Sequence, residues 1–158
     1  MIFLEEKNGW SGSFDIYVKS IDSEEFIHEK TIKNTIVDNG LNFLRDALRG
    51  IVSDAEIKYI AVGTSSVSVT TSDTQLGSEF FRKPVYSKSV TGTGALQTIA
   101  ILDDSEAIAQ IEEIGVFAGS TASTSSNSGI MISRVLYSRN KTNLESIQIQ
   151  RTDTIARG

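Results

Sequence analysis

Short segments in which apolar and polar residues alternate run through most of the chain. Near the N-terminus, Phe14, Ile16 and Val18 share one face while polar residues occupy the other. The C-terminal segment repeats the pattern with Ile147 and Ile149. A period of two residues is typical of a β-strand with one buried face. The sequence therefore predicts a mainly β, β-sandwich-like fold built from many short strands.

Turn-forming clusters separate these segments. The predicted strands cover residues 13–20, 26–36, 57–63, 79–90, 95–104, 110–119, 129–138 and 144–155. Residues 91–94, "TGTG", predict a tight hairpin, and residues 120–128, "STASTSSNS", predict a longer loop between two strands. Pro84 cannot donate a backbone hydrogen bond, so we expect it at a sheet edge or a bulge.

A hydroxyl-rich stretch, "TSSVSVTT" at residues 64–71, follows the strand that ends at Gly63. It lacks the lysine and the glycine spacing of a phosphate-binding loop. We interpret it as an uncharged connector that leads into a short turn, with Ser72 as a capping residue of that turn.

One stretch has helical rather than strand periodicity. Three leucines recur at a spacing of three to four residues and predict the apolar face of a short amphipathic helix at about residues 38–49. They are Leu41, Leu44 and Leu48. Asp38 or Asn39 is suited to cap the start of this helix, and Gly50 stands where a helix would end.

Composition limits the class of protein. The 158 residues suit one domain, with an N-terminal hairpin at about residues 1–35 and a helix-plus-strands body at about 36–158. A net charge of -5 argues against a nucleic-acid partner. No apolar run reaches membrane-spanning length, and the first ten residues lack the pattern of a signal peptide. We therefore expect neither nucleic-acid binding nor membrane insertion.

Residue types that carry enzyme chemistry are sparse. His28 is the single histidine and the chain has no cysteine, which leaves no motif for a nucleophile–histidine site and no thiolate or multi-histidine metal site. Glu112 and Glu113 are neighbours on a predicted strand, so they point to opposite faces. Residues 102–106, "LDDSE", lack the spacing of a calcium-binding loop. We expect no catalytic site, no cofactor and no metal.

Basic residues gather around the proline and again in the C-terminal third. The assembly candidates among them and beside them are Arg82, Lys83, Pro84, Lys88, Arg134 and Arg139. These charges either discourage edge-to-edge strand pairing or contact acidic faces of neighbouring subunits. Trp10 is a further assembly candidate, with a sugar-stacking platform and a packed core edge as the alternatives.

Several short motifs follow one another from the predicted helix to the C-terminal third. They are Val37, Gly40 and Leu44; Tyr59, Ile60, Ala61, Gly63 and Thr64; Asp73, Thr74, Leu76, Glu79 and Arg82; and Glu113, Ile114, Gly115 and Phe117. In their order and spacing, residues 34–155 resemble tail-fibre and baseplate-associated proteins of tailed bacteriophages, of the tail-collar fibre type. Ser65 stands where that family often has a second glycine. Such fibres usually continue into a long shaft, so a chain of this length is expected to be a small structural or adaptor subunit.

This resemblance implies a non-enzymatic structural subunit of a phage tail or phage-tail-like particle, in the baseplate or tail-fibre attachment region. It would be made in the bacterial cytoplasm and reside in the virion tail or the tail-like particle. Expected partners are further copies of itself and neighbouring tail, baseplate or fibre proteins, with a host surface glycan as a further candidate. The alternatives are a carbohydrate-binding module that uses Trp10, Tyr17 or Tyr86, and a head-decoration or neck protein.

The motif residues are expected to be structural. Those we single out are Gly40, Tyr59, Gly63, Asp73, Glu79, Glu113, Gly115 and Phe117. If Glu79 and Arg82 begin one strand and Glu113 lies on its neighbour, an acid–arginine pair would lock the loop ends together. Such a pair contributes about 1 kcal/mol or less when it is exposed.

Overall fold

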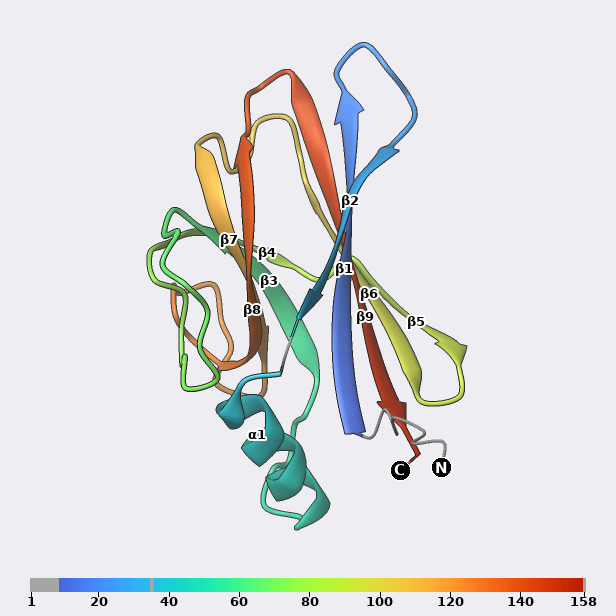
Figure 1. Ribbon diagram of the computed structural model, residues 1–158, viewed down its shortest axis with the longest axis vertical. Helices are drawn as coiled ribbons and strands as arrows, with labels where there is room; N and C mark the ends of the chain where they lie inside the picture. Colours follow the sequence, from blue (N-terminus) through green and yellow to red (C-terminus); the bar gives the residue numbers. More distant parts are fainter. Residues whose placement is uncertain (1–8, 35, 158) are drawn as a thin grey trace, which may run out of the picture.

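The computed structural model describes residues 9–34 and 36–157 as two antiparallel β-sheets with one α-helix at one end (Figure 1). The strands are β1 (Gly9–Ser20), β2 (Ile27–Asn34), β3 (Ile57–Gly63), β4 (Glu79–Pro84), β5 (Ser87–Gly92), β6 (Ala95–Leu102), β7 (Gln110–Ala118), β8 (Ile130–Asn140) and β9 (Glu145–Ala156), and the helix is α1 (Asp38–Leu48). The five-stranded sheet has the order β2-β1-β9-β6-β5, and the four-stranded sheet has the order β4-β3-β7-β8. The predicted β-sandwich-like fold with one short helix is confirmed.

The first and last strands lie side by side in the five-stranded sheet. β1 pairs with β9 from Gly9 opposite Ala156 to Ser20 opposite Glu145, so the start of β1 and the end of β9 lie together at one end of the molecule (Figure 1). β1 also pairs with β2 in an N-terminal hairpin. Residues 1–8 of the hairpin that the sequence predicts lie outside the described residues.

The main core fills the space between the sheets. Phe14 and Ile16 of β1 pack there with Ile147 and Ile149 of β9, as their alternation predicts. β7 does not alternate in this way, since it is buried on nearly its whole length. Its outer face is covered as well, because the connections that follow β3 and β7 fold back over the four-stranded sheet (Figure 1).

A second, smaller core forms on that outer face. It consists of Ala61, Leu76, Phe117 and Met131, and Tyr59 packs against it. Leu76 comes from the connection between β3 and β4 and is 1 % exposed. The hydroxyl-rich stretch therefore belongs to a segment that is attached to the sheet by a buried side chain.

The start of α1 depends on contacts distant in sequence. The predicted caps, Asp38 and Asn39, are wrong, because Val37 is the N-cap residue and no side chain caps the helix. Instead the backbone N–H of Asp38 donates to the carbonyl oxygen of Thr71 at 2.8 Å. Gly40 lets the helix approach β8, since a Cβ there would lie 2.8 Å from the Ile132 carbonyl oxygen. The first N–H groups of a helix have no partner within the helix, and the connector provides one for Asp38.

The end of α1 follows the predicted local chemistry. Gly50 has φ of +79°, the left-handed conformation that glycine adopts easily. Its N–H donates to the Ala47 carbonyl, and the N–H of Ile51 donates to the Asp46 carbonyl, both at 3.1 Å. This pair of bonds is the Schellman arrangement that closes many helices.

The predicted buried stripe of α1 is only partly correct. Leu41 is 47 % exposed and Leu48 is 83 % exposed, so these two leucines face solvent. The side chains of Phe43, Leu44 and Ala47 face the sandwich instead. The helix lies against the end of the sheets rather than between them. A contact face narrower than the predicted leucine stripe is therefore enough to attach it.

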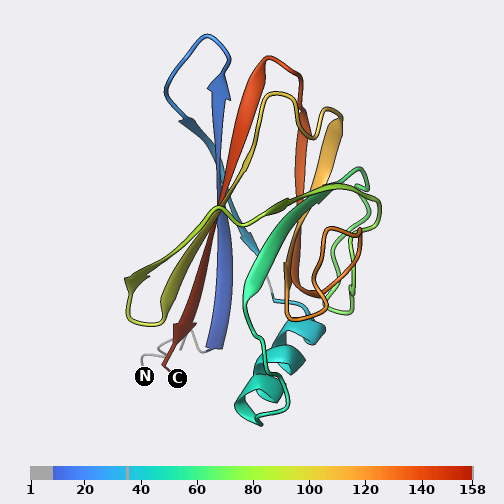
Figure 2. The same cartoon turned by 180° about the vertical axis from the view of Figure 1, so that it is seen from behind.

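Pro84 occupies a sheet edge, as predicted. It is the last residue of β4, an edge strand, and lies opposite Tyr59. Val85 and Tyr86 then carry the chain across to β5 in the other sheet, which Figure 2 shows from behind. A residue without an N–H is well suited to this point, because the ladder ends there.

Candidate functional site

Glu113 of β7 is the central residue of the motif cluster. Its side chain is completely buried. Oε1 accepts hydrogen bonds from the backbone N–H groups of Ser65 (3.3 Å) and Ser78 (2.8 Å), and Oε2 accepts one from Gly77 (2.9 Å). Oε2 also accepts a hydrogen bond from Arg134 Nε at 2.7 Å. One carboxylate thus fixes both ends of the connector between β3 and β4.

Arg134 of β8 holds the middle of the same connector. Nη1 lies 3.2 Å from the Asp73 carboxylate, and Nη2 donates to the carbonyl oxygens of Val67 (2.8 Å) and Ser65 (3.5 Å). The side chain of Arg134 is 3 % exposed. A buried arginine with several acceptors around it is an ordered structural element, because its planar group fixes the acceptors in space.

Asp73, rather than the predicted Ser72, caps the turn in this connector. Its carboxylate accepts hydrogen bonds from the backbone N–H and the hydroxyl of Thr70, at 3.0 and 2.9 Å. Burial raises the pKa of the Asp73 carboxyl, but the hydrogen bonds from Thr70 and Arg134 outweigh it and hold that pKa below its usual value. The ionised form of Asp73 is therefore the form that the fold stabilises.

Arg82 and Glu79 form a second pair, which organises the loop between β7 and β8. Their side chains are 4 % and 0 % exposed and form two hydrogen bonds of 2.8 Å. Arg82 Nη1 also donates to the carbonyl oxygens of Ser123 and Ser128, and Glu79 accepts a hydrogen bond from the Asn127 N–H. The guanidinium lies 4.5 Å from the centre of the Phe117 ring.

The predicted acid–arginine lock therefore exists, as two pairs rather than one. Arg82 pairs with Glu79, and Glu113 pairs with Arg134, which the sequence placed among the interface candidates. Both pairs are buried, so the small contribution expected of an exposed pair does not apply to them.

Two motif glycines make room for this cluster. A Cβ on Gly63 would collide with the Glu113 carboxylate and lie 2.6 Å from the Ser78 carbonyl oxygen. A Cβ on Gly115 would lie 2.8 Å from a methyl carbon of Leu76. Close approach of neighbouring groups, rather than backbone conformation, therefore favours glycine at both positions.

The structure separates the predicted interface residues into two groups. Arg82 and Arg134 are buried and fully engaged within the chain, so they do not form a surface for a partner, which corrects the prediction for these two. Lys83, Lys88 and Arg139 lie nearer the surface. Each forms ion pairs within the chain: Lys83 with Asp103 and Glu106, Lys88 with Glu56, and Arg139 with Glu29 and Glu145. Pro84 is exposed, and Trp10 is half-buried with its indole N–H bonded to Asp153 at 2.9 Å.

Sequence reasoning missed a third buried ion pair, between Arg151 and Asp153 of β9. Arg151 is completely buried, donates to Asp153 at 2.9 Å and lies 4.8 Å from the centre of the Phe14 ring. It also donates to the Ser133 hydroxyl of the opposite sheet at 2.8 Å. A Cβ on Gly12 would collide with the guanidinium, so Gly12 in an otherwise regular strand was the available signal.

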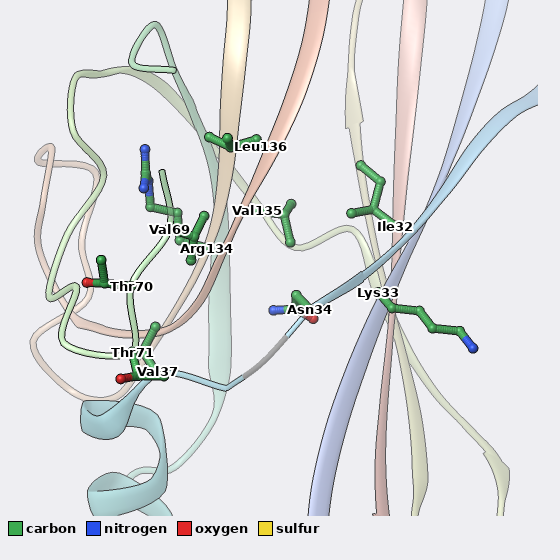
Figure 3. Close-up of a pocket in the computed structure, with 10 residues that line it drawn as sticks. All are labelled: Ile32, Lys33, Asn34, Val37, Val69, Thr70, Thr71, Arg134, Val135 and Leu136. Carbon is green, nitrogen blue, oxygen red and sulfur yellow. The ribbon is translucent and has the colours of Figure 1, made fainter. Parts of the chain in front are cut away.

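A groove of about 580 Å³ runs beside the Glu113–Arg134 cluster (Figure 3). Its walls come from the edge strands β2 and β8 and from the connector, with Ile32, Val69, Thr70 and Val135 among its lining residues. In Figure 3, Arg134 lies on the connector side and Lys33 points away from it. Because Arg134 already binds Glu113 and loop carbonyls, the groove presents mainly apolar side chains and threonine hydroxyls, which suit packing against another chain.

Comparison with known proteins gives no match: no family model, no curated protein and no solved structure resembles this chain at a significant level. Among the described residues, no group of three or more potential metal ligands comes together. Within the same residues, no helix has the length and apolar character required to cross a membrane.

Proposed function

We propose that this protein is a non-enzymatic structural subunit of a phage tail or phage-tail-like particle, in the baseplate or tail-fibre attachment region. The order of the motif residues supports the particle, and their positions support a structural role. Glu113 and Glu79 attach connectors to the four-stranded sheet, and Asp73 does so through Arg134 of β8. No step of chemistry is required of them.

The observation that best supports the proposal is that buried ion pairs hold two long hydroxyl-rich connectors in fixed positions. A loop that is ordered before binding has already lost the conformational entropy that an interface would otherwise take from it. The connector between β3 and β4 also displays Val67, which is 71 % exposed, and Val69, which is 38 % exposed. A fixed loop that displays apolar side chains suits contact with neighbouring subunits in a rigid particle.

Electron microscopy of purified particles tests this proposal most directly. An epitope tag at residues 124–126, the exposed tip of the loop between β7 and β8, should add density at the tail, baseplate or fibre attachment. Purified particles that lack the subunit, or a subunit that is found on the head, would refute the tail location. Sedimentation of the isolated protein should show an oligomer, and a monomer with both ends resistant to proteases would count against a role in assembly.

Glycan binding is a second candidate because one of its predicted aromatic platforms is accessible. Tyr86 is 76 % exposed, whereas Trp10 is half-buried and bonded to Asp153. Binding on a glycan array that disappears in Tyr86→Ala and persists in Tyr17→Ala would favour this function. No binding on the array would leave the structural role as the better account.

A further inference from the structure

The solvent face of α1 is apolar, although its leucines follow the pattern of a buried stripe. Leu41 and Leu48 are exposed, and so is Ile51, which comes just after the helix. Leu41 and Leu48 are seven positions apart in the sequence, so they lie on one side of the helix. This side points away from the sandwich, because Phe43 and Ala47 are directed toward it. α1 therefore displays apolar side chains at one end of the molecule (Figure 1).

Two arginines make the C-terminal half of this face basic. Arg45 lies between Leu41 and Leu48 on the same side of the helix, and Arg49 follows one turn later. Their side chains are 57 % and 60 % exposed, and both donate to the single carboxylate of Asp46. One carboxylate balances only one of the two positive charges, so a net positive charge remains. We call this surface the helix face, and it consists of Leu41, Arg45, Leu48, Arg49 and Ile51.

Three connections form a second surface at the opposite end of the long axis (Figures 1 and 2). They join β1 to β2, β6 to β7 and β8 to β9. The backbone N–H of Ile21 donates to the Leu144 carbonyl oxygen at 2.9 Å, and that of Lys141 donates to the Ala109 carbonyl oxygen at 3.0 Å. These hydrogen bonds hold the three connections together as one surface. We call residues 21–27, 103–109 and 141–144 the loop face.

The loop face is apolar and acidic. Each of its connections contributes an apolar side chain that is at least half exposed, and these are Ile21, Ile27, Ile108 and Leu144. Asp22, Glu24 and Glu25 are exposed beside them, and none of the three forms an ion pair with another described residue. Lys19, which donates to the Ser23 carbonyl oxygen, balances one of these negative charges. The first connection of the loop face therefore keeps a net negative charge.

We propose that the loop face of one copy of this chain docks on the helix face of a second copy, in a head-to-tail contact. The contact removes apolar side chains of both faces from water and brings opposite net charges together, whereas two helix faces or two loop faces would oppose like charges. Because the two faces differ and lie at opposite ends of the molecule, the contact repeats from copy to copy and does not form a two-fold dimer. This inference rests on the assembly role proposed above and specifies the contact between copies.

Sedimentation of the isolated protein and of matched variants tests the contact. The wild type should form oligomers that grow with protein concentration and shrink as salt is added, because salt screens the opposite charges. Leu48→Ser, at a site that is 83 % exposed, should weaken association by about tenfold or more. Val90→Ser, at a site of β5 that is 84 % exposed, should leave association unchanged. Equal effects of the two substitutions, or a wild type that stays monomeric at millimolar concentration, would overturn the proposal.

Charge reversal tests whether these two faces meet. Glu24→Lys/Glu25→Lys should weaken association by about tenfold or more, and so should Arg45→Glu/Arg49→Glu, because each variant places like charges together. The quadruple variant carries reversed charges on both faces, so it should associate about as strongly as the wild type. A quadruple variant that associates as weakly as the double variants would contradict the contact between the loop face and the helix face.

A mixing experiment distinguishes a head-to-tail contact from a symmetric one. Glu24→Lys/Glu25→Lys retains an intact helix face, and Leu48→Ser retains an intact loop face. Neither variant should associate alone, but an equimolar mixture should form one-to-one dimers and nothing larger, because each dimer uses its only intact pair of faces. Circular dichroism establishes that both variants are folded. A variant that dimerises by itself, or folded variants that do not associate on mixing, would refute the head-to-tail arrangement.

The two proposals fail in different ways. A subunit that is located on the tail, but whose association is insensitive to substitutions in both faces, would refute this inference alone. A protein that associates head to tail as described, but is absent from purified particles, would refute the particle function and leave the contact intact.

Discussion

Replacement of Glu113 by glutamine is the sharpest test of the pinned connector. Glutamine has nearly the same shape as glutamate, but it lacks the charge and replaces one acceptor oxygen with an NH2 donor. In the structure both carboxylate oxygens accept two hydrogen bonds each, from Ser65 and Ser78 on one side and from Gly77 and Arg134 on the other. In either orientation of the amide, its NH2 group faces two N–H donors that the carboxylate oxygen had accepted.

The size of the effect follows from burial. Glu113 is completely buried and Arg134 is 3 % exposed, so the loss of one partner leaves a charge that water cannot reach. Breaking a buried pair in this way costs about 3–5 kcal/mol. Asp73 remains 3.2 Å from Arg134 and still balances part of its charge. We therefore expect Glu113→Gln to lower the free energy of unfolding by about 3 kcal/mol, near the lower end of this range. That is a large share of the roughly 5–15 kcal/mol that stabilises a typical domain.

Urea unfolding followed by Trp10 fluorescence and by circular dichroism measures this loss. Glu112→Gln is the matched control, because Glu112 is the preceding residue of the same strand, is half-buried and accepts one 3.3 Å hydrogen bond from Ser138. It should change the free energy of unfolding by about 0.5 kcal/mol or less. The double variant Glu113→Gln/Arg134→Met should lose less than the sum of the two single variants, since the two side chains interact directly.

Hydrogen exchange gives the local part of the same test. In Glu113→Gln the amides of Ser65, Gly77 and Ser78 should exchange faster, because their acceptor is weakened. A loss of stability below about 1 kcal/mol, together with unchanged exchange at these amides, would refute the idea that Glu113 holds the connector.

Two further predictions concern the same cluster. Gly63→Ala should destabilise the protein by about 1–3 kcal/mol in urea unfolding, because its Cβ would meet Glu113 and the Ser78 carbonyl; Gly92→Ala, with only Ala95 as near as 4.0 Å, is the control, and equal effects of the two would contradict this account. The lowered pKa of Asp73 stabilises the fold at pH values above the ordinary carboxyl pKa, and this contribution should disappear as the pH falls through the lower pKa of the folded state. Asp73→Asn should therefore reduce the acid dependence of the unfolding midpoint, and an unchanged dependence would show that Asp73 does not contribute to it.

Sequence patterns predicted part of this site correctly. Asp73, Glu79, Glu113 and the glycines were identified as structural residues, and an acid–arginine lock between loop ends was expected. Glu79 and Arg82 do pair. The pair between Glu113 and Arg134 was not predicted, because the contacts of this cluster join residues as far apart as Ser65 and Glu113 (48 positions) or Val67 and Arg134 (67 positions). A single sequence gives no information on which of several arginines meets which acid.

The sequence by itself determined most of the strands and the end of the helix. The single strand predicted at residues 79–90 is wrong, because β4 and β5 lie in different sheets. A period of two in β1 and β9, the glycine turn before β6 and the left-handed Gly50 are local features, since backbone geometry and nearest neighbours fix them. Tertiary structure decided where α1 begins, which of its leucines are covered and which arginines are buried. The Thr71 carbonyl at the start of α1 and the acceptors around the buried Arg134 both belong to a connector that returns to the sheet from distant positions. Leu48 is exposed because of where the helix lies on the sheets, which its own sequence does not specify. Burial and long-range hydrogen bonds form only after the sheets have paired, and for that reason they leave little trace in the local pattern of residues.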